Sequence, residues 1–253
     1  MTEFTHLSKA PITEAIIQYG VVPREGLTLD ELAKLADSVL KKFKGDLRVV
    51  HPLFDMDGEL LLDVATGEAI PTIHHKAQVG LKLESSVDHK AVLLTLHGVS
   101  FHKLKPYTSW TEVFGEASQL WSHYRSATQP ISIRRLGTRF INRLQLPVPA
   151  RLSEYLSGPP LVSDEFLVAG YLRRLNLRHQ RTNLRVNMVE AVEMPSADVA
   201  GDVVVILDND VYTIKSTVPT DDGAVNELFE QMHQLKNELF WNSLTPQVLE
   251  SYK

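Results

Sequence analysis

Ile131-Ser-Ile-Arg-Arg-Leu-Gly-Thr-Arg-Phe-Ile-Asn-Arg-Leu-Gln-Leu146, in the middle of the chain, predicts a long strand whose two faces differ in chemistry. Successive side chains of a strand point to opposite faces of its sheet. One face carries Leu136, Thr138, Phe140, Asn142, Leu144 and Leu146, and the other carries Arg135, Gly137, Arg139, Ile141, Arg143 and Gln145. We therefore expect a core face and, opposite it, a polar face rich in arginine.

The helix expected just before this strand is rich in aromatic residues. It starts at the capping box Ser109-Trp-Thr-Glu112, whose serine and glutamate side chains bond free N–H groups of the first turn, and it ends near Tyr124 or Arg125. Trp110, Trp121 and Tyr124 share one helix face. This spacing favours packing against the sheet, with a ligand pocket as the alternative.

The elements on either side of this helix and strand echo each other. Before them we expect a strand at 10–22, a helix at 29–43, and strands at 47–54, 59–64, 77–85 and 90–97. Residues 65–76 look irregular, and a short piece at 99–104 leads into the helix. After them we expect a short helix at 150–156 and strands at 165–178, 182–193, 202–207 and 211–216. An Asp208-Asn-Asp210 turn should separate the last two strands. Two helices should follow, which start at Asp221-Asp222 and at Thr245-Pro246.

The predicted fold class is α+β, with two pseudo-repeated β-α-β-β-β-α halves whose antiparallel sheets pack against helices. The first half is residues 1–128 and the second is residues 129–253, with a fourth strand after the short helix of the second half. We expect the two halves to pack as one compact unit. The pattern leaves open whether they share one sheet.

Composition narrows the class of protein. The chain has 253 residues, is 43 % hydrophobic and 23 % charged, and so has the composition of an ordinary globular protein. It contains no cysteine, which excludes disulfides, thiolate metal ligands and thiol catalysis. No apolar run approaches the roughly 20 residues of a membrane span, and the N-terminus lacks the pattern of a signal peptide. We expect a cytoplasmic protein that does not bind membranes.

Charge is distributed unevenly along the chain. Residues 131–187 hold ten arginines and no lysine against three acids, whereas residues 188–253 hold twelve acids against three lysines. The net charge of the whole chain is −5. A basic region between acidic ones can steer an anionic partner toward itself.

No motif in the sequence predicts catalysis. There is no Walker loop, no G-x-G-x-x-G and no G-x-S-x-G element, and the acid pairs Asp55/Asp57 and Asp221/Asp222 are those of turns and helix starts. The only adjacent histidines, His74 and His75, fall in the segment expected to be a loop and have no spaced partners for a metal. We therefore predict no metal, no cofactor and no catalytic residue, and the expectation leans away from an enzyme.

The arginines are the sharpest feature. Alternation places Arg174 and Arg178 on one face of their strand, and Arg185 shares a face with Asn183 and Asn187 on the next. The candidate residues for binding an anion or a partner are Arg135, Arg139, Arg143, Arg174, Arg178 and Arg185. Arginine offers planar, bidentate contacts to carboxylate or phosphate.

Three alternatives stand beside this interpretation. The arginines are also those of an ordinary solvated sheet face, and they can pair with the acidic C-terminal third of the same chain. Nucleic acid is the weaker form of the same hypothesis, because the chain is acidic overall, with a pI near 6.1.

The apolar stripe of the C-terminal helix, with Phe229, Met232, Phe240 and Trp241, predicts core packing or, alternatively, a homodimer interface.

Three motifs, in order, resemble those of one protein family. They are Ala10-Pro-Ile-Thr-Glu-Ala-Ile16, the helix pattern Tyr107-x-x-Trp110-x-x-x-Phe114-x-Glu116-x-x-x-Leu120-Trp121-x-x-Tyr124, and Arg139-Phe-Ile-Asn142-Arg143. Together they are similar to a family of uncharacterised bacterial proteins of about this length, described as sporadically distributed, and the resemblance covers the whole chain. The patchy distribution implies an accessory, horizontally acquired role, such as defence or a toxin–antitoxin system.

The leading hypothesis is a non-catalytic accessory protein that recognises an acidic protein or other anionic partner through the arginine-rich face. The alternative is a small-molecule or nucleotide-binding sensor with a pocket between sheet and helices. A hydrolase without a recognisable motif is the third hypothesis, and the least supported.

Overall fold

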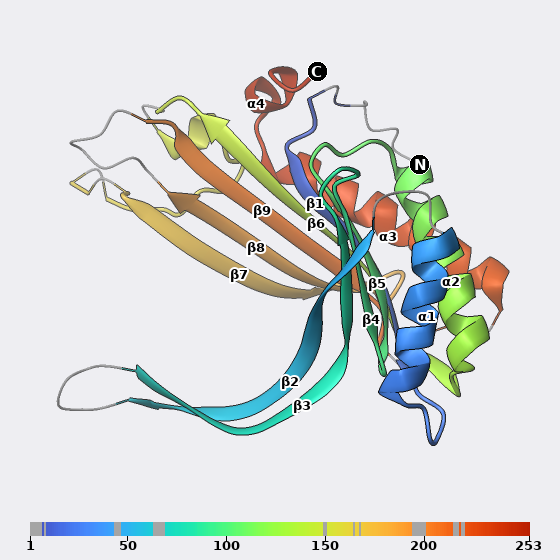
Figure 1. The fold of residues 1–253 in the computed structure, drawn as a ribbon. Helices are drawn as coiled ribbons and strands as arrows, with labels where there is room; N and C mark the ends of the chain where they lie inside the picture. Colours follow the sequence, from blue (N-terminus) through green and yellow to red (C-terminus); the bar gives the residue numbers. More distant parts are fainter. Residues whose placement is uncertain are drawn as a thin grey trace.

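The computed structural model describes residues 7, 9–42, 47–62, 69–148, 151–163, 165–166, 168–193, 201–214, 218 and 221–253. It combines helices with one large antiparallel sheet, which confirms an α+β fold (Figure 1). The first half of the chain contributes β1 (Ile12–Val22), α1 (Leu29–Lys42), β2 (Arg48–Leu62), β3 (Ala69–Ser85), β4 (Lys90–Thr95), β5 (Gly98–Leu104) and α2 (Trp110–Thr128). The second half contributes β6 (Ser132–Leu146), the 3-10 turn η1 (Leu152–Glu154), β7 (Gly170–Arg178), β8 (Arg185–Glu193), β9 (Val203–Tyr212), α3 (Asp222–Ser243) and α4 (Pro246–Glu250).

All nine of these strands form one sheet, in the order β2-β3-β4-β5-β1-β6-β9-β8-β7. The first strand of each half lies at the centre, where β1 and β6 pair antiparallel with Ile17 opposite Thr138. This pairing answers the question that the sequence left open. The two halves share a single continuous sheet, and the division at residue 128 stays a prediction.

Capping residues start the helices where the sequence predicted. Thr28 and Glu31 form a reciprocal box at α1, in which each backbone N–H donates to the other residue's side chain, at 3.1 and 3.4 Å. Ser109 accepts from the Glu112 N–H at the start of α2, at 3.2 Å. Asp221 does the same for Ala224 at the start of α3, at 2.8 Å. Each cap satisfies an N–H group that has no partner inside its helix.

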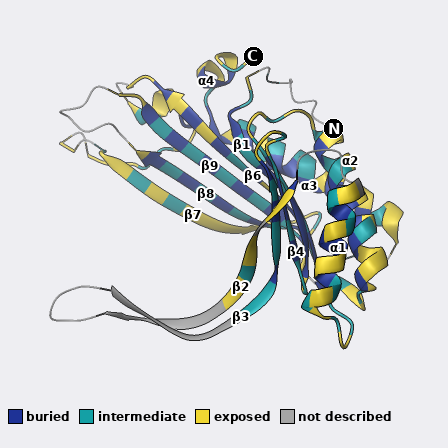
Figure 2. Cartoon of the chain, viewed as in Figure 1, coloured by how far each residue is buried: buried dark blue, intermediate teal, exposed yellow. Residues whose placement is uncertain are grey.

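The main core lies between the sheet and helices α1, α2 and α3 (Figure 2). Tyr19 of β1 stacks on Trp121 of α2 with ring centroids 4.6 Å apart, and Phe229 of α3 lies 5.0 Å from the same tyrosine ring. A second cluster, around Leu144, packs under α4. Trp121 and Tyr124 are therefore core residues, as the spacing favoured.

The homodimer interface expected on the C-terminal helix is corrected by burial. Phe229 and Met232 are fully buried in the main core, and Phe240 is buried in the second cluster. These three side chains cover the sheet of their own chain, so they are not available to a second copy. Trp241, the fourth residue of the predicted interface, is partly exposed, and a homodimer stays a prediction.

Three expected elements differ from the structure. Residues 69–76, expected to be irregular, form the first part of β3, because pairing with β2 satisfies their backbone, and β2 itself is continuous where two strands were expected. Residues 63–68 lie outside the described residues, as do the side chains of His74 and His75. The helix expected at 150–156 is a single 3-10 turn, since Gly158-Pro-Pro160 leaves no room for a second turn.

The turn expected at Asp208-Asn-Asp210 is also wrong, because these residues lie inside β9. Asp and Asn are unfavourable in strands on intrinsic preference, but cross-strand partners override such preferences. Asp208 and Asp210 both bond arginines of β6. The acids of this segment are therefore partners of the arginine strand.

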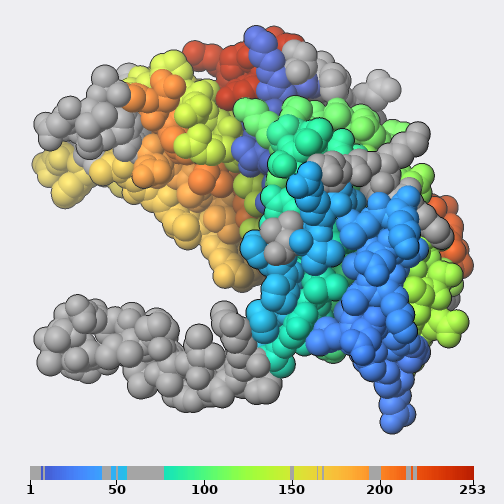
Figure 3. All heavy atoms as spheres, viewed as in Figure 1, coloured from blue at the N-terminus to red at the C-terminus, as the bar shows by residue number. Residues whose placement is uncertain are grey.

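The sheet is curved, and its helix-free side is hollowed. Figure 3 shows a hollow bordered by β7, β8 and β9 on one side and by the start of β2 on the other. Among the described residues no helix packs on this side of β6 to β9, which we call the open face (Figure 1).

Candidate functional site

The open face carries all six arginines that the sequence predicted as binding residues. The register runs without interruption from β6 through β9 and β8 to β7, so that outward positions of the four strands form common rows. The outward arginines are Arg135, Arg139 and Arg143 on β6, Arg185 on β8, and Arg174 and Arg178 on β7. The structure thus brings them together on one surface, but it does not leave them all unpaired.

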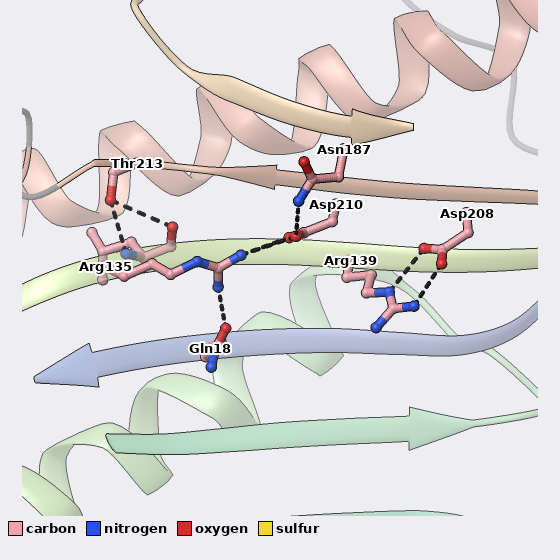
Figure 4. A network of polar contacts seen from close by, with 8 residues as sticks. Gln18, Arg135, Arg139, Asn187, Asp208, Asp210 and Thr213 are labelled. Carbon is pink, nitrogen blue, oxygen red and sulfur yellow. Dashed lines mark hydrogen bonds and ion pairs between the residues drawn. The ribbon is translucent and has the colours of Figure 1, made fainter. Parts of the chain in front are cut away.

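Arg135 is neutralised inside the chain. Its Nη2 atom lies 3.0 Å from each carboxylate oxygen of Asp210 on β9 (Figure 4). Its Nη1 atom donates to the side-chain oxygen of Gln18 on β1, and its guanidinium lies 4.5 Å from the ring centroid of Tyr212. Gly137 makes this possible, because a Cβ atom there would lie 2.7 Å from Nη1. Arg135 is therefore engaged by groups of its own chain on β1 and β9.

Arg139 forms a bidentate pair with Asp208. Its Nε and Nη2 atoms lie 2.9 and 2.6 Å from the two carboxylate oxygens (Figure 4). The hydrogen bond to Asp208 raises the pKa of the Arg139 guanidinium, against the opposing effect of partial burial. Asn187 of β8 donates to Asp210 at 3.2 Å and extends the polar network across the sheet. The intramolecular pairing that the acidic C-terminal third allowed is therefore realised at Arg135 and Arg139.

The other four arginines have no carboxylate partner within the part of the chain that the structure describes. Arg143 and Arg174 are exposed, and Arg185 is half-buried. Arg178 donates to the side-chain oxygen of Asn183, at 3.2 and 2.6 Å, and lies opposite Arg185 across the β7–β8 ladder. The uncompensated positive charge of the open face is therefore concentrated toward β7 and β8.

An apolar row extends across the sheet from Arg143. In register with Arg143 are Ile206 of β9, Ala191 of β8 and Leu172 of β7. Leu172 is 72 % exposed, and the other two side chains are partly exposed. Exposed apolar side chains next to charged ones are typical of protein–protein contacts.

A hydrogen-bonded series of three side chains lies in a hollow of about 200 Å³ on the same face, beside Arg135 and Arg139. Ser100 Oγ lies 2.9 Å from Nε2 of His102, whose Nδ1 lies 2.7 Å from Oε1 of Glu14. The bond to His102 lowers the pKa of the Glu14 carboxyl, which outweighs its partial burial. Sequence reasoning missed this series because His102 and Glu14 come from different strands.

The order serine, histidine, carboxylate is that of nucleophilic hydrolases, but the surroundings of Ser100 do not complete such a site. Ser100 lies in the middle of β5, paired with Gln18 on one side and Leu93 on the other. An oxyanion hole needs unoccupied donors beside the nucleophile, and the backbone here is committed to the sheet. The series is best described as a cross-strand polar contact that holds β1 and β5 together.

The covered face holds the second candidate site, a cavity of about 230 Å³ between β6 and helices α2 and α3. The aromatic part of its lining is Tyr107, Trp110, Phe140, Phe240 and Trp241. His233 of α3 also lines it and stacks on Trp110, with ring centroids 4.3 Å apart. Burial lowers the pKa of His233 to about 3, so the imidazole is neutral near pH 7. Of the three aromatic residues for which a pocket was the alternative, Trp110 lines this cavity, whereas Trp121 and Tyr124 do not.

Lys236 lies in the wall of this cavity and is 6 % exposed. Its Nζ atom lies 3.7 Å from the ring centroid of Phe140, and neither a carboxylate nor any other hydrogen-bond acceptor contacts it within the described chain. Burial lowers the pKa of the Lys236 ammonium to about 7. A buried lysine without a counter-ion is uncommon, because no Coulombic attraction offsets the free-energy cost of removing the charge from water.

Sequence reasoning missed Lys236, although a signal was present. Phe229, Met232, Lys236 and Phe240 follow each other at helical spacing, so the lysine interrupts an apolar stripe that faces the sheet. A charged residue in such a stripe either reaches the surface or faces a cavity. The sequence alone does not distinguish these two cases.

The described residues offer neither a metal site nor a membrane-spanning helix. Among the described residues there is no group of three or more histidine, aspartate or glutamate side chains that could hold a metal ion. None of the helices in the described ranges is long and apolar enough to cross a membrane. No family model matches the chain, and no curated protein matches it either. The family resemblance of the three sequence motifs therefore stays a prediction.

Proposed function

We propose that this chain is a non-catalytic accessory protein that recognises an acidic protein through the open face of its sheet. The observation that carries the proposal is the set of arginines toward β7 and β8 that lack a carboxylate partner in the described chain. Arg143 ends the apolar row of Ile206, Ala191 and Leu172, Arg174 lies in the next row on β7, and Arg185 lies three rows away along β8. Acidic side chains of a partner would neutralise these arginines, while its apolar side chains would cover the apolar row.

Two features favour a protein over a nucleic acid. Asp208 and Asp210 interleave with the arginines of the same face, and a polyphosphate backbone would be repelled by them. The net charge of −5 also opposes the long-range attraction that nucleic-acid binding relies on. A protein surface of mixed charge fits this pattern better, since it can place its own cations beside the two aspartates.

The test is a binding titration with two labelled probes of equal net charge, a peptide of alternating glutamate and leucine and a single-stranded oligonucleotide. We expect the peptide to bind, and the triple variant Arg143→Glu, Arg174→Glu and Arg185→Glu to bind it at least about tenfold more weakly. A matched control is Lys34→Glu, Lys41→Glu and Lys105→Glu, three exposed lysines away from the open face that give the same change in net charge.

Each result of this titration has a clear meaning. If both triple variants lost peptide affinity equally, the loss would be explained by net charge alone. That result would contradict a specific binding surface on the open face. Tighter binding of the oligonucleotide would contradict the choice of a protein partner. The melting temperature of the arginine variant should stay unchanged, because no carboxylate contact of the described chain is removed.

A second candidate function is a small-molecule sensor, and the cavity beside Lys236 favours it. A retained or added ligand would raise the melting temperature, since binding to the native state alone stabilises it. The resemblance to the sporadically distributed bacterial family supports an accessory setting, such as defence or a toxin–antitoxin system, for either function.

We also propose that the two halves of the chain are a structural pseudo-repeat. The strand order supports it, because each half starts at the centre and continues outward, through β5, β4 and β3 on one side and through β9, β8 and β7 on the other. Each half also ends in a long helix on the covered face, α2 and α3.

A further inference from the structure

The cavity on the covered face contains hydrogen-bond donors that lack acceptors. Lys236 contributes an ammonium group, which is acceptor-free within the described part of the chain and lies over the ring of Phe140. The Nδ1 atom of His233 is buried and has no hydrogen-bond partner. Polar groups inside proteins are nearly always paired, so an ammonium that faces a cavity without an acceptor calls for an explanation.

The contact of His233 with Asn237 indicates which ring nitrogen carries the proton. The side-chain nitrogen of Asn237 lies 3.4 Å from Nε2 of His233, and an amide nitrogen can only donate. Nε2 is therefore the acceptor, and the neutral ring carries its proton on Nδ1. Both unpaired groups are donors, and the ammonium of Lys236 is the one that a ligand with oxygen atoms in the cavity would satisfy.

No carboxylate of the described chain balances this site. The ionisable groups that line it are Lys236 and His233 from α3 and Tyr107 from the segment before α2, while the lining residues of β6 and of the segment before β1 are uncharged. Glu230 is the acid that contacts the lining, and it accepts from the indole N–H of Trp110 at 2.5 Å. The side chains that line the cavity itself are therefore cationic or neutral, and Glu230 is engaged by Trp110.

We propose that this cavity binds a small aromatic carboxylate, whose carboxylate group pairs with Lys236 and whose ring packs against Trp110 and Phe140. The inference rests on the second candidate function, a small-molecule sensor, and names its ligand class. The aromatic lining supplies most of the contact area, and the lysine supplies the orientation, which is the usual division of labour in a ligand pocket.

The size of the cavity supports a small ligand. Its volume of about 230 Å³ is below the range of about 300–1,000 Å³ typical of sites for drug-sized molecules. A single ring or a fused pair of rings with a short acid group fits that space, whereas a nucleotide does not. The volume therefore favours a small acid over the nucleotide version of the sensor hypothesis.

The test compares acids with their neutral amides on the intact protein. Benzoate and indole-3-acetate should raise the melting temperature at millimolar concentration, and benzamide and indole-3-acetamide should raise it much less. The variant Lys236→Met keeps the apolar stem and should weaken binding of the acids by about 10- to 100-fold. A matched control is Lys103→Met, since Lys103 is also buried but donates to the Asp88 carbonyl at 2.9 Å, away from the cavity.

Proton uptake provides a second measurement that does not depend on a variant. A carboxylate beside Lys236 favours its charged form, so binding at about pH 8 should take up close to one proton per site. Calorimetry in two buffers with different heats of ionisation measures this number. Binding without proton uptake would contradict pairing with Lys236.

The remaining outcomes separate this inference from the sensor hypothesis. If amides bind as tightly as acids, the cavity is a ligand site but the carboxylate class is wrong. If neither acids nor amides shift the melting temperature, both the inference and the sensor hypothesis fail. Neither result bears on peptide binding at the open face, which is measured separately.

Discussion

The two faces of the sheet differ in whether their cationic side chains have a counter-ion. On the open face, Arg139 remains 47 % exposed and nevertheless has a bidentate carboxylate partner in Asp208. On the covered face, Lys236 is 6 % exposed and has an aromatic ring in place of a counter-ion. The cation that water could have solvated is paired, and the one that most needs a partner has none in the described chain.

This contrast separates structural contacts from candidate functional ones. A half-exposed ion pair contributes little to stability, so the pairing of Arg139 is explained by the sheet itself. A buried, unpaired charge is costly, and its presence is explained best by a ligand that supplies the missing partner. The same strand, β6, carries both faces, since Arg139 and Phe140 are neighbours in sequence.

The largest expected effect is that of Phe140→Ala. Phe140 is buried and contacts Tyr107, Trp110 and Lys236, so the variant would leave a large cavity beside the one already present. We expect the free energy of unfolding to fall by about 3–5 kcal/mol, as for other buried phenylalanines. Urea unfolding followed by tryptophan fluorescence measures the change.

The neighbouring variant Arg139→Ala is the control, because it alters the open face at the adjacent position. It should cost about 1 kcal/mol or less, since the pair it breaks is half-exposed. Similar losses in the two variants would contradict the distinction between a core face and an open face.

Lys236→Met should stabilise the protein, which is the opposite of the usual effect of a core substitution. Replacing a buried, unpaired charge with an apolar side chain of similar length is expected to add roughly 1–4 kcal/mol at about pH 6. The pKa of Lys236 falls from 10.5 to about 7 on folding, so the unfolded chain binds more protons between these two values. Wild-type stability therefore rises with pH across this window.

The stability difference between the two proteins should accordingly shrink as the pH rises above 7, and chemical unfolding at about pH 6 and pH 9 measures it. The ligand experiment uses the same variant, so stability and binding should change in opposite directions. A destabilised Lys236→Met protein with an unchanged pH dependence would mean that the ammonium has a partner in the folded state.

Much of the architecture follows from local signals in the sequence. The alternation of Leu136 to Leu146 predicted both faces of β6, and the boxes at Thr28 and Ser109 predicted where α1 and α2 begin. The sequence does not encode so directly which strands are neighbours. Asp208-Asn-Asp210 was predicted as a turn because the arginines that neutralise these acids are distant in sequence and adjacent only in the sheet.

The candidate sites show the same limit. Alternation placed six arginines on one face, but which of them are already paired depends on the register between β6 and β9. Lys236 was overlooked because a lysine in an apolar stripe usually extends to the surface. Its burial results from the position of α3 over Phe140, a contact between residues that are far apart in the chain.

A double-mutant cycle at Arg139 and Asp208 should give a coupling energy of about 0.5–1 kcal/mol. Asp208 is 13 % exposed, which places the pair at the upper end of this range despite the exposure of the arginine. The cycle combines Arg139→Ala, Asp208→Ala and the double variant, with unfolding free energies measured at low and high salt. Coupling should fall as salt rises, and a coupling of several kcal/mol would mean that the open face is less accessible to water than the structure indicates.

The smallest expected effect is at Glu14, where the open-face series of Ser100, His102 and Glu14 ends. Because the bond from His102 lowers the pKa of this carboxyl below 4.5, its ionised form stabilises the folded state, and that contribution is complete above 4.5 and is lost as the pH falls through the folded pKa. Glu14→Gln should therefore lower stability at neutral pH by a few tenths of a kcal/mol to about 1 kcal/mol. It should make no difference in acid, once the wild-type carboxyl is protonated. Unfolding curves of both proteins from neutral pH into the acid range measure this convergence. A difference that persisted in acid would mean that Glu14 stabilises β1 through packing, and that the series between β1 and β5 does not depend on its charge.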